Sequence, residues 1–325
     1  MGRLYLPLVL FAAWCVLGCE KLPQRADEPL AAPVQSSPWD NPRGRGSQLQ
    51  TANYRIFTTA NNHRLASILP GFMEASRRNY LRILNLPERP AGKLMPMYVL
   101  GTREEWAALT RSVLGEQAEK FLMIESGGYC YKEVCVLWEM GGLGTLLVAA
   151  HEGMHQFIHH RLSDQLPMWL EEGLCTQAEG YEIEGRRVSF SPKLNLSRNV
   201  DLEQTIARRF WIPIDRLLPM DAGDAVGGYT ERTVGYYGQL WALVQFIRSD
   251  PSYSAGLDRL LADAEAGRLN EALGVPRGAL KELRLRGRAY NQTVSEPLFK
   301  HYICDDLKTF EKRFKHFAAR LAKLE

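Results

Sequence analysis

Two histidines and a glutamate in this sequence have the spacing of the ligands and the base of a metal site. They lie in the run His151-Glu152-Gly153-Met154-His155, which has the pattern H-E-x-x-H. On an α-helix, positions i and i+4 lie one turn apart on the same face, so both imidazoles can bind one metal ion while Glu152 points to a water on it. The chain has seven histidines among 325 residues, which makes a chance pair at this interval improbable. The pattern predicts metal-dependent hydrolysis.

A third ligand is expected because a catalytic zinc ion takes three protein ligands and keeps one position open for water. Twelve residues after His155 begins the run Pro167-Met168-Trp169-Leu170-Glu171-Glu172-Gly173-Leu174. This run is typical of a second helix with acidic residues in its early turns. Two histidines and a glutamate form one recognised zinc-binding set, and we expect Glu172 to be the third ligand.

The two motifs together resemble the gluzincin metallopeptidases, whose HExxH helix is followed by a short loop and a helix marked W-L-x-E-G. Residues 169–173 match that second motif, and the closest likeness is to the peptidase MA-like group, which includes uncharacterised bacterial secreted domains. The likeness covers about residues 50–290 and includes the runs 211–218 and 237–244. It implies a zincin-like (thermolysin-like) fold that binds Zn²⁺ and hydrolyses peptide bonds in a peptide or protein substrate.

The resemblance also assigns roles to single residues. Glu152 would act as the general base on the zinc-bound water, and Tyr237 would donate a hydrogen bond to the oxyanion, with Tyr236 as the alternative. No G-x-M-E-N string precedes His151, so exopeptidase activity is unsupported and an endopeptidase is expected. The metzincin pattern is excluded because Ile158 and Arg161 stand where it requires glycine and histidine.

Neighbouring polar residues have simpler interpretations. His159 continues the i+4 series, but the helix carries it about 6 Å beyond His155, so we assign it to packing or to the surface. Glu171 is interpreted either as a carboxylate that contacts a metal ligand without binding the metal or as an exposed residue. Glu179 could orient His151 or His155 through a ring N–H.

The cysteines beyond the N-terminal region leave several pairings open. Cys130 and Cys135 flank a tight hairpin, where cross-strand pairing is sterically easy. Cys175 stands where the peptidase MA-like group has a small residue, one turn after Glu172. It either forms a disulfide with Cys304, which we favour, or approaches the metal. The alternative is that all four are free buried thiols.

The N-terminus has the features of an export signal. The apolar run Leu4 to Leu17 is about 14 residues long, too short to span a bilayer. It ends in Val16-Leu17-Gly18-Cys19, which resembles a bacterial lipobox with Cys19 as the lipidated first residue; a plain secretory signal is the alternative. We expect an exported protein that is lipid-anchored to a bacterial membrane, facing the periplasm or the cell surface.

Composition limits the other functions. With 46% hydrophobic and 24% charged residues, the chain belongs to the globular class. The 40 basic and 37 acidic residues give a net charge of +3 without a long basic block, so nucleic-acid binding is unsupported. The oligomeric state is left open. The rival to an enzyme is a non-catalytic surface lipoprotein that uses the same fold for binding, although such a protein would have no need of Glu152.

Hydrophobic periodicity predicts an α+β fold with a mainly helical C-terminal half. We expect strands at 54–59, 95–100 and 127–138, with the edge strand near 127–137 beside the site, and early helices at 62–84, 102–113 and from a cap at Thr145. Later helices are expected near 201–210, 231–249, 255–265, 277–287 and 305–324.

Four segments follow from these patterns. Residues 1–18 form the signal peptide, and residues 19–50, with five prolines, form a linker whose composition cannot support a core. Residues 51–165 form an α/β subdomain that ends in the HExxH helix, and 166–325 form a mainly helical subdomain that carries the third ligand. A chain that begins near Thr51 is therefore expected to fold and to keep its zinc.

Overall fold

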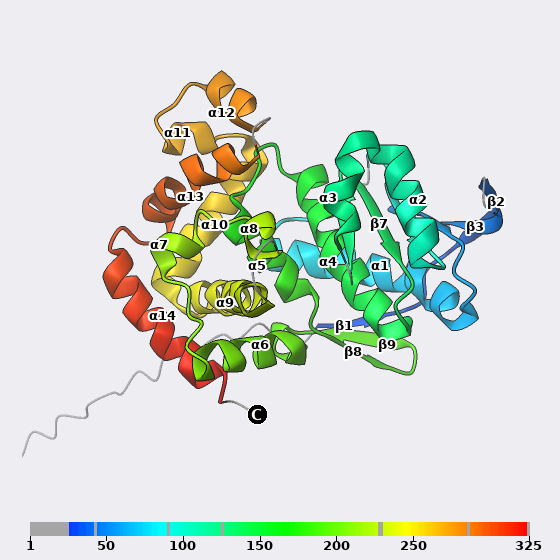
Figure 1. Cartoon of the computed structure of the whole chain (residues 1–325), viewed down its shortest axis with the longest axis horizontal. Helices are drawn as coiled ribbons and strands as arrows, with labels where there is room; N and C mark the ends of the chain where they lie inside the picture. The colour runs from blue at the N-terminus through cyan, green and yellow to red at the C-terminus, as the bar shows by residue number, and fades with distance from the viewer. Residues whose placement is uncertain are drawn as a thin grey trace, which may run out of the picture.

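The computed structural model describes residues 26–41, 44–89, 92–124, 127–226, 230–284 and 287–323. The signal peptide and Cys19 lie outside these residues. The fold is α+β, with a mixed sheet in the N-terminal half and mainly helices in the C-terminal half, as predicted. Figure 1 shows the sheet with its helices on one side of the molecule and the later helices on the other.

The main sheet has six strands in the order β2-β3-β4-β5-β7-β6. Its central strands β4, β5 and β7 run parallel, whereas β6 returns antiparallel to β7 and β2-β3 form an antiparallel hairpin beside β4. The strands are β2 (Gln35–Asn41), β3 (Gly44–Gln50), β4 (Tyr54–Thr58), β5 (Met95–Leu100), β6 (Gly128–Tyr131) and β7 (Val134–Trp138).

The period-2 alternation of the strands places different residues on the two faces of this sheet. Cys135 and Leu137 of β7 face the large core that holds helices α1 (His63–Leu84) and α4 (Gly142–Arg161). Val136 and Trp138 face the smaller core under α2 (Arg103–Leu114) and α3 (Ala118–Leu122). The sheet is thus covered on both faces, and α4 lies against β6 and β7.

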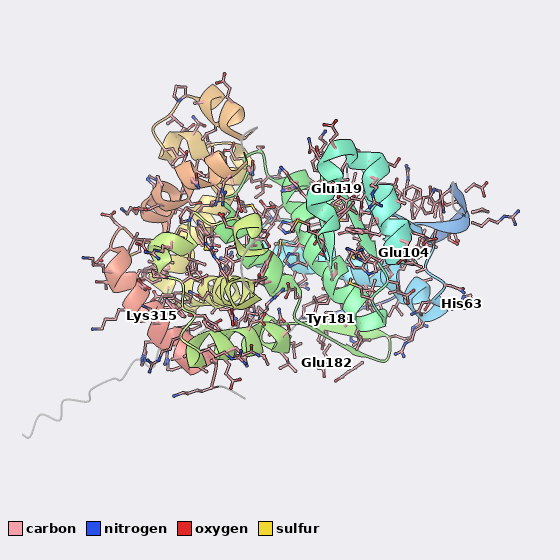
Figure 2. All side chains as sticks on the ribbon, in the orientation of Figure 1. His63, Glu104, Glu119, Tyr181, Glu182 and Lys315 are labelled. Carbon is pink, nitrogen blue, oxygen red and sulfur yellow. The ribbon has the colours of Figure 1, made fainter. Side chains whose placement is uncertain are left out.

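A second, three-stranded sheet pairs β1 (Ala26–Pro29) with the hairpin of β8 (Tyr181–Glu184) and β9 (Arg187–Phe190). The Tyr181 hydroxyl, on β8, donates to the Leu143 carbonyl at 2.7 Å, in the first turn of α4. Figure 2 labels Tyr181 close to this end of α4. The Tyr181 ring also packs edge-on against Phe72 of α1, with ring centroids 4.9 Å apart. This small sheet therefore contacts both α1 and the first turn of α4.

The segment expected to be a linker is part of the fold. Residues 26–50 form three strands, Leu30 and Leu49 are buried, and Glu28 forms ion pairs with Arg78 and Arg82 of α1. Prolines do not prevent this because β2 is an edge strand, where a missing N–H is tolerated. A few buried leucines and backbone pairing with β4 and β9 are enough to attach the segment, so a boundary at residue 51 is wrong.

The C-terminal half is helical and packs around α9, which Figure 1 shows nearly end-on. Helices α6 and α5 lie against α9, as do α10 and α14. The helices are α5 (Met168–Ala178), α6 (Leu196–Ala207), α7 (Ile214–Leu217), α8 (Ala222–Val226), α9 (Thr230–Ser249), α10 (Pro251–Ala266), α11 (Leu269–Ala272), α12 (Arg277–Arg284), α13 (Arg288–Tyr302) and α14 (Leu307–Leu321). Within the described ranges, no helix combines the length and the apolar character needed to cross a bilayer.

Most predicted elements are confirmed, including the strand 95–100 and the helix at 62–84. Thr102 caps α2 as predicted, because its side chain accepts a hydrogen bond from the Glu105 N–H. Thr145 is not a cap: α4 begins at Gly142, and the Thr145 hydroxyl donates back to the Gly141 carbonyl at 2.9 Å. The helix predicted here is therefore present, but it begins about one turn earlier than a cap at Thr145 would place it.

Candidate metal centre

Helix α4 is held in a buried position that fixes the two histidines. Its Ala150 carbonyl accepts a hydrogen bond from the Tyr80 hydroxyl of α1 at 2.9 Å, and Gln156 donates to the Pro96 carbonyl at 2.6 Å. Glycine is required at 153 because a Cβ there would lie 2.6 Å from the Tyr80 hydroxyl. The close approach of α1 to α4 at Gly153 therefore presents His151 and His155, on the same helix, toward α5.

Helix α5 brings Glu172 to the two histidines. This helix packs tightly on α9, because a Cβ at Gly173 would lie 2.6 Å from Val244 Cγ2 and 3.2 Å from the Leu240 carbonyl oxygen. Glu172 Oε2 lies 3.4 Å from His151 Nε2 and 3.6 Å from His155 Nε2. The glycine of the W-L-x-E-G motif thus permits the packing that places the preceding glutamate.

These distances suit a bound metal ion. Two atoms that each lie about 2.0 to 2.2 Å from a tetrahedral zinc ion are roughly 3.3 to 3.6 Å apart. Glu172 is buried, and its Oε2 has no hydrogen-bond partner among the described residues, which is costly for an anionic oxygen unless a cation binds it. The donor set and the unpartnered oxygen both fit a divalent metal held by His151, His155 and Glu172.

The other ring nitrogen of each histidine contacts a second carboxylate. His151 Nδ1 lies 2.7 Å from Glu179 Oε1, and His155 Nδ1 lies 2.7 Å from Glu171 Oε1. A carboxylate can only accept, so each Nδ1 carries a proton, and Nε2 is the nitrogen left to bind a metal in place of its own proton. Glu179 therefore orients His151, as one reading of the sequence expected, and both tautomers are those that metal binding needs.

Glu179 is itself held in place by residues that no sequence motif had indicated. Arg198 donates to both of its oxygens, from Nε at 2.9 Å and Nη2 at 3.0 Å. Asn195, the residue that caps α6, donates to Glu179 Oε2 at 2.7 Å. The fixed, bidentate pair keeps Glu179 ionised and aimed at His151. This helix was expected near 201–210, whereas α6 begins at Leu196, so the predicted helix start missed the cap at Asn195 that could have indicated these residues.

Glu171 bridges two histidines and is not on the surface. Its Oε1 contacts His155 Nδ1 at 2.7 Å and His159 Nε2 at 2.8 Å. His159 is thus neither a metal ligand nor a simple packing residue, since it holds the carboxylate that orients His155. The i+4 spacing that could have suggested a third ligand instead supplies a partner for the supporting carboxylate.

The electrostatics of the cluster follow from burial and paired charge. Burial lowers the pKa of His151, but the Glu172 and Glu179 carboxylates outweigh it and raise the pKa to about 9. Burial raises the pKa of Glu179, yet Arg198 and His151 reverse this and hold it at about 2. Burial also raises the pKa of Glu172, but the two histidines outweigh this effect and keep the pKa well below its usual range. Glu172 and Glu179 are therefore carboxylates at neutral pH.

Glu152 lies beside the edge strand and differs from the other carboxylates. Burial raises its pKa, and the positive charges of His151 and His155 oppose that rise without cancelling it. A Cβ at Gly128 of β6 would lie 3.3 Å from Glu152 Cγ, and the Cys135 thiol of β7 donates to the Glu152 carbonyl at 3.1 Å. The predicted edge strand thus borders Glu152, and β6 is the last strand of its sheet.

The two candidate tyrosines lie in different surroundings. The ring centroids of Tyr237 and His151 are 6.5 Å apart, and the Arg198 guanidinium lies 4.9 Å from the Tyr237 ring centroid. Tyr237 is partly exposed, whereas Tyr236 is fully buried, and the Tyr236 hydroxyl has no hydrogen-bond partner in the part of the chain that the structure describes. Of the two, Tyr237 is the one placed beside a candidate ligand with access to solvent.

The four cysteines in the described ranges are free thiols. Cys130 and Cys135 lie directly opposite each other across β6 and β7, as the hairpin predicts, but the disulfide expected between them is not formed. The favoured pairing of Cys175 with Cys304 is not formed. Donor atoms of Cys175, His151 and His155 all lie within 4.8 Å of one another, and this buried group could bind a metal ion. The alternative reading, in which Cys175 approaches the metal, matches the structure.

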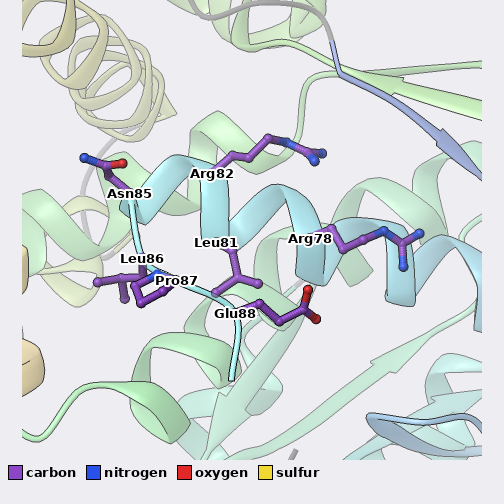
Figure 3. Close-up of a pocket in the computed structure, with 7 residues that line it drawn as sticks. All are labelled: Arg78, Leu81, Arg82, Asn85, Leu86, Pro87 and Glu88. Atoms are coloured by element: carbon purple, nitrogen blue, oxygen red, sulfur yellow. The ribbon is translucent and has the colours of Figure 1, made fainter. Parts of the chain in front are cut away.

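A hollow of about 470 Å³ lies apart from this cluster, at the C-terminal end of α1. Figure 3 shows its lining on the last turns of α1 and the loop that follows. Arg78 and Arg82 in this lining are ion-paired with Glu28, at 2.6 Å and 2.7 Å. These two arginines are therefore already paired, and the hollow is not part of the metal centre.

The structure brings the predicted residues together in one place. His151, His155 and Glu172 share one centre, with Glu152 and Tyr237 at its border. No family model, no curated protein and no solved structure matches this chain. The geometry of these residues therefore carries the functional conclusion.

Proposed function

We propose that this protein is a zinc-dependent peptidase of the gluzincin type, with His151, His155 and Glu172 as metal ligands. The observation that carries the proposal is the buried Glu172 Oε2, which has no hydrogen-bond partner among the described residues and lies 3.4 Å and 3.6 Å from two imidazole nitrogens. The other nitrogen of each imidazole contacts a carboxylate. Zinc bound there would lower the pKa of a water toward about 7 and polarise a carbonyl.

Glu152 supplies the proton transfers. It takes the proton of the attacking water and passes it to the leaving amine, which requires a base whose pKa lies nearer neutrality than that of an ordinary carboxylate. Burial raises the pKa of Glu152 in that direction. Glu152 therefore differs from Glu172, whose pKa His151 and His155 lower. The first carboxylate suits a base and the second a metal ligand.

The other groups bind and orient the substrate. An extended peptide pairs with the outer edge of β6, which is the last strand in the sheet order. Gly128 on this strand lies next to Glu152, so a peptide bond paired there lies beside the base. Tyr237, near His151, donates its phenolic proton in a hydrogen bond to the oxyanion. Pairing along a strand suits an endopeptidase.

We further propose that the chain is exported and lipid-anchored to a bacterial membrane through Cys19. The proposal depends on the apolar run that ends in Val16-Leu17-Gly18-Cys19. Metabolic labelling with a fatty-acid analogue tests it: the natural chain should take up label and Cys19→Ala should not. Label retained by Cys19→Ala would refute lipidation at this residue.

The test of the peptidase proposal combines metal analysis with hydrolysis. The purified protein should contain about one zinc per chain, and it should cleave members of a peptide library or casein. A chelator should stop cleavage and added zinc should restore it. Bound zinc without any cleavage would instead support a non-catalytic lipoprotein that uses the centre for binding, and a protein without transition metal would refute the site.

A further inference from the structure

Cys175 is a donor at the metal centre that the proposed hydrolysis does not use. Its sulfur lies within 4.8 Å of donor atoms of both His151 and His155. Cys175 has no solvent exposure. It follows Glu172 by three positions on α5, so both side chains emerge on the same face of that helix. The thiol and the carboxylate thus approach the two histidines from one side.

The surroundings of Cys175 differ from those of the other cysteines. The Cys135 thiol donates to the Glu152 carbonyl at 3.1 Å, and the Cys304 thiol donates to the Asp306 carbonyl at 3.5 Å. The Cys175 thiol instead forms a hydrogen bond with His155, and the Glu172 and Glu171 carboxylates are the nearby negative charges. Because Glu172 Oε2 is buried without a hydrogen-bond partner among the described residues, a cation is already expected between these side chains.

We propose that Cys175 is a fourth protein ligand of the metal, beside His151, His155 and Glu172. The inference rests on the proposed function for the other three ligands. Zinc binds thiolate sulfur, imidazole nitrogen and carboxylate oxygen in tetrahedral sites, and a site with four protein ligands has no open position. The Cys175 thiol releases its proton to solvent when its sulfur binds and regains a proton when it leaves.

A metal with four protein ligands has no position free for water or substrate. A water and a substrate carbonyl need the position that the sulfur occupies, so hydrolysis requires Cys175 to leave the metal first. The natural enzyme therefore cleaves more slowly than a chain without this thiol, because loss of the thiol opens the site. A thiol that only packs in the core would neither hold the metal nor restrain the reaction.

Cobalt tests the assignment without relying on activity. The full chain is loaded with Co²⁺, whose complexes with thiolate show an intense charge-transfer band in the near ultraviolet. The natural chain should show this band. The near-isosteric Cys175→Ser and the smaller Cys175→Ala should bind Co²⁺ without it. Their zinc affinity should fall by at least about tenfold, the lower limit for losing even an indirect support of a metal ligand.

Cys130→Ala is the matched control, because Cys130 is the other thiol near the histidine face of α4 and contacts His159. This variant should keep the band. A natural chain that binds Co²⁺ without the band would overturn the inference, as would a band that persists in both Cys175 variants. Circular dichroism of each variant shows whether it is folded.

Hydrolysis then separates this inference from the proposed function. We expect Cys175→Ala to cleave peptides faster than the natural chain at saturating zinc. A band that disappears in Cys175→Ala, with no cleavage by any variant, would leave the ligand assignment standing and refute the peptidase. Cleavage by a cobalt-loaded natural chain without the band would refute the assignment alone, and failure to bind Co²⁺ or Zn²⁺ would overturn both.

Discussion

His151 Nδ1 lies 2.7 Å from a carboxylate oxygen of Glu179, a residue 28 positions further along the chain. This contact selects the tautomer in which Nε2 is free for a metal, and Arg198 holds the carboxylate from its other side. The ligands on α4 thus depend on a support that begins at the end of α5 and continues into α6. Such supports are worth about 10- to 100-fold in metal affinity.

Glu179→Gln should therefore lower zinc affinity by about 10- to 100-fold. The amide removes the negative charge and turns an N–H₂ group toward either His151 or Arg198, so one of the two contacts is lost. Competition titration with a chromophoric chelator measures the change. Glu203→Gln on the exposed side of α6 is the matched control and should bind zinc normally. Equal affinity in both variants would contradict the role given to Glu179.

Glu152→Gln should keep its zinc and lose turnover. Its side chain is placed as the base beside β6 and not as a ligand, and an amide cannot accept the proton of the attacking water. We expect a fall in kcat of at least about 100-fold, with a metal content equal to that of the natural chain. Zinc loss would mean that Glu152 is a ligand, and undiminished cleavage would mean that another group is the base.

Zinc should stabilise the natural fold, because the buried Glu172 carboxylate and both imidazoles meet it only in the folded state. At free zinc 100 times the Kd, the free energy of unfolding should rise by about 2.7 kcal/mol. Thermal unfolding with and without chelator measures this. Glu172→Gln should show a much smaller zinc-dependent increase, since it lacks the anionic oxygen between His151 and His155. If zinc raised the free energy of unfolding of Glu172→Gln as much as that of the natural chain, Glu172 would not be a ligand.

The elements that present the ligands could be predicted because their signals are local. The H-E-x-x-H spacing specifies one helix face, and the short apolar run at 95–100 specifies a strand. The W-L-x-E-G motif contains the glycine that lets α5 approach α9. In each case the residues that determine the element are neighbours in sequence, so periodicity and turn chemistry are sufficient.

The supporting contacts could not be predicted because they join distant segments. Arg198 and Glu179 meet only after α5, the β8-β9 hairpin and α6 have packed together, and no spacing rule relates them. The attachment of residues 26–50 is similar: few of their side chains are buried, and the pairing of β1 with β9 joins Ala26 to Phe190, about half the chain away. The composition of this segment shows its prolines and polar residues. It does not show that β9 and β4 offer strand edges with which the segment pairs.

Removing residues 26–50 should destabilise the body. Leu30 and Leu49 are buried, and burying such a side chain is worth about 1.5 to 3 kcal/mol. A chain that begins at Thr51 loses both leucines and leaves the edge of β4 unpaired. We expect its free energy of unfolding, measured in urea, to be at least about 3 kcal/mol below that of a chain that begins at Ala26. Equal stability of the two chains would restore the linker interpretation.

Gly71→Ala tests the same attachment at one contact. A Cβ at Gly71 of α1 would lie 1.6 Å from the Leu30 carbonyl oxygen, so in a chain that begins at Ala26 the substitution should cost about 1 to 3 kcal/mol by displacing that segment. A chain that begins at Gln35 lacks Leu30 but keeps β2 and β3. There the methyl group meets no obstacle from Leu30, and alanine should add about 0.5 to 1 kcal/mol as the better helix former. Urea unfolding of the four chains measures both effects. The sign should reverse between the two lengths, and an equal loss in both would mean that Leu30 does not lie on α1.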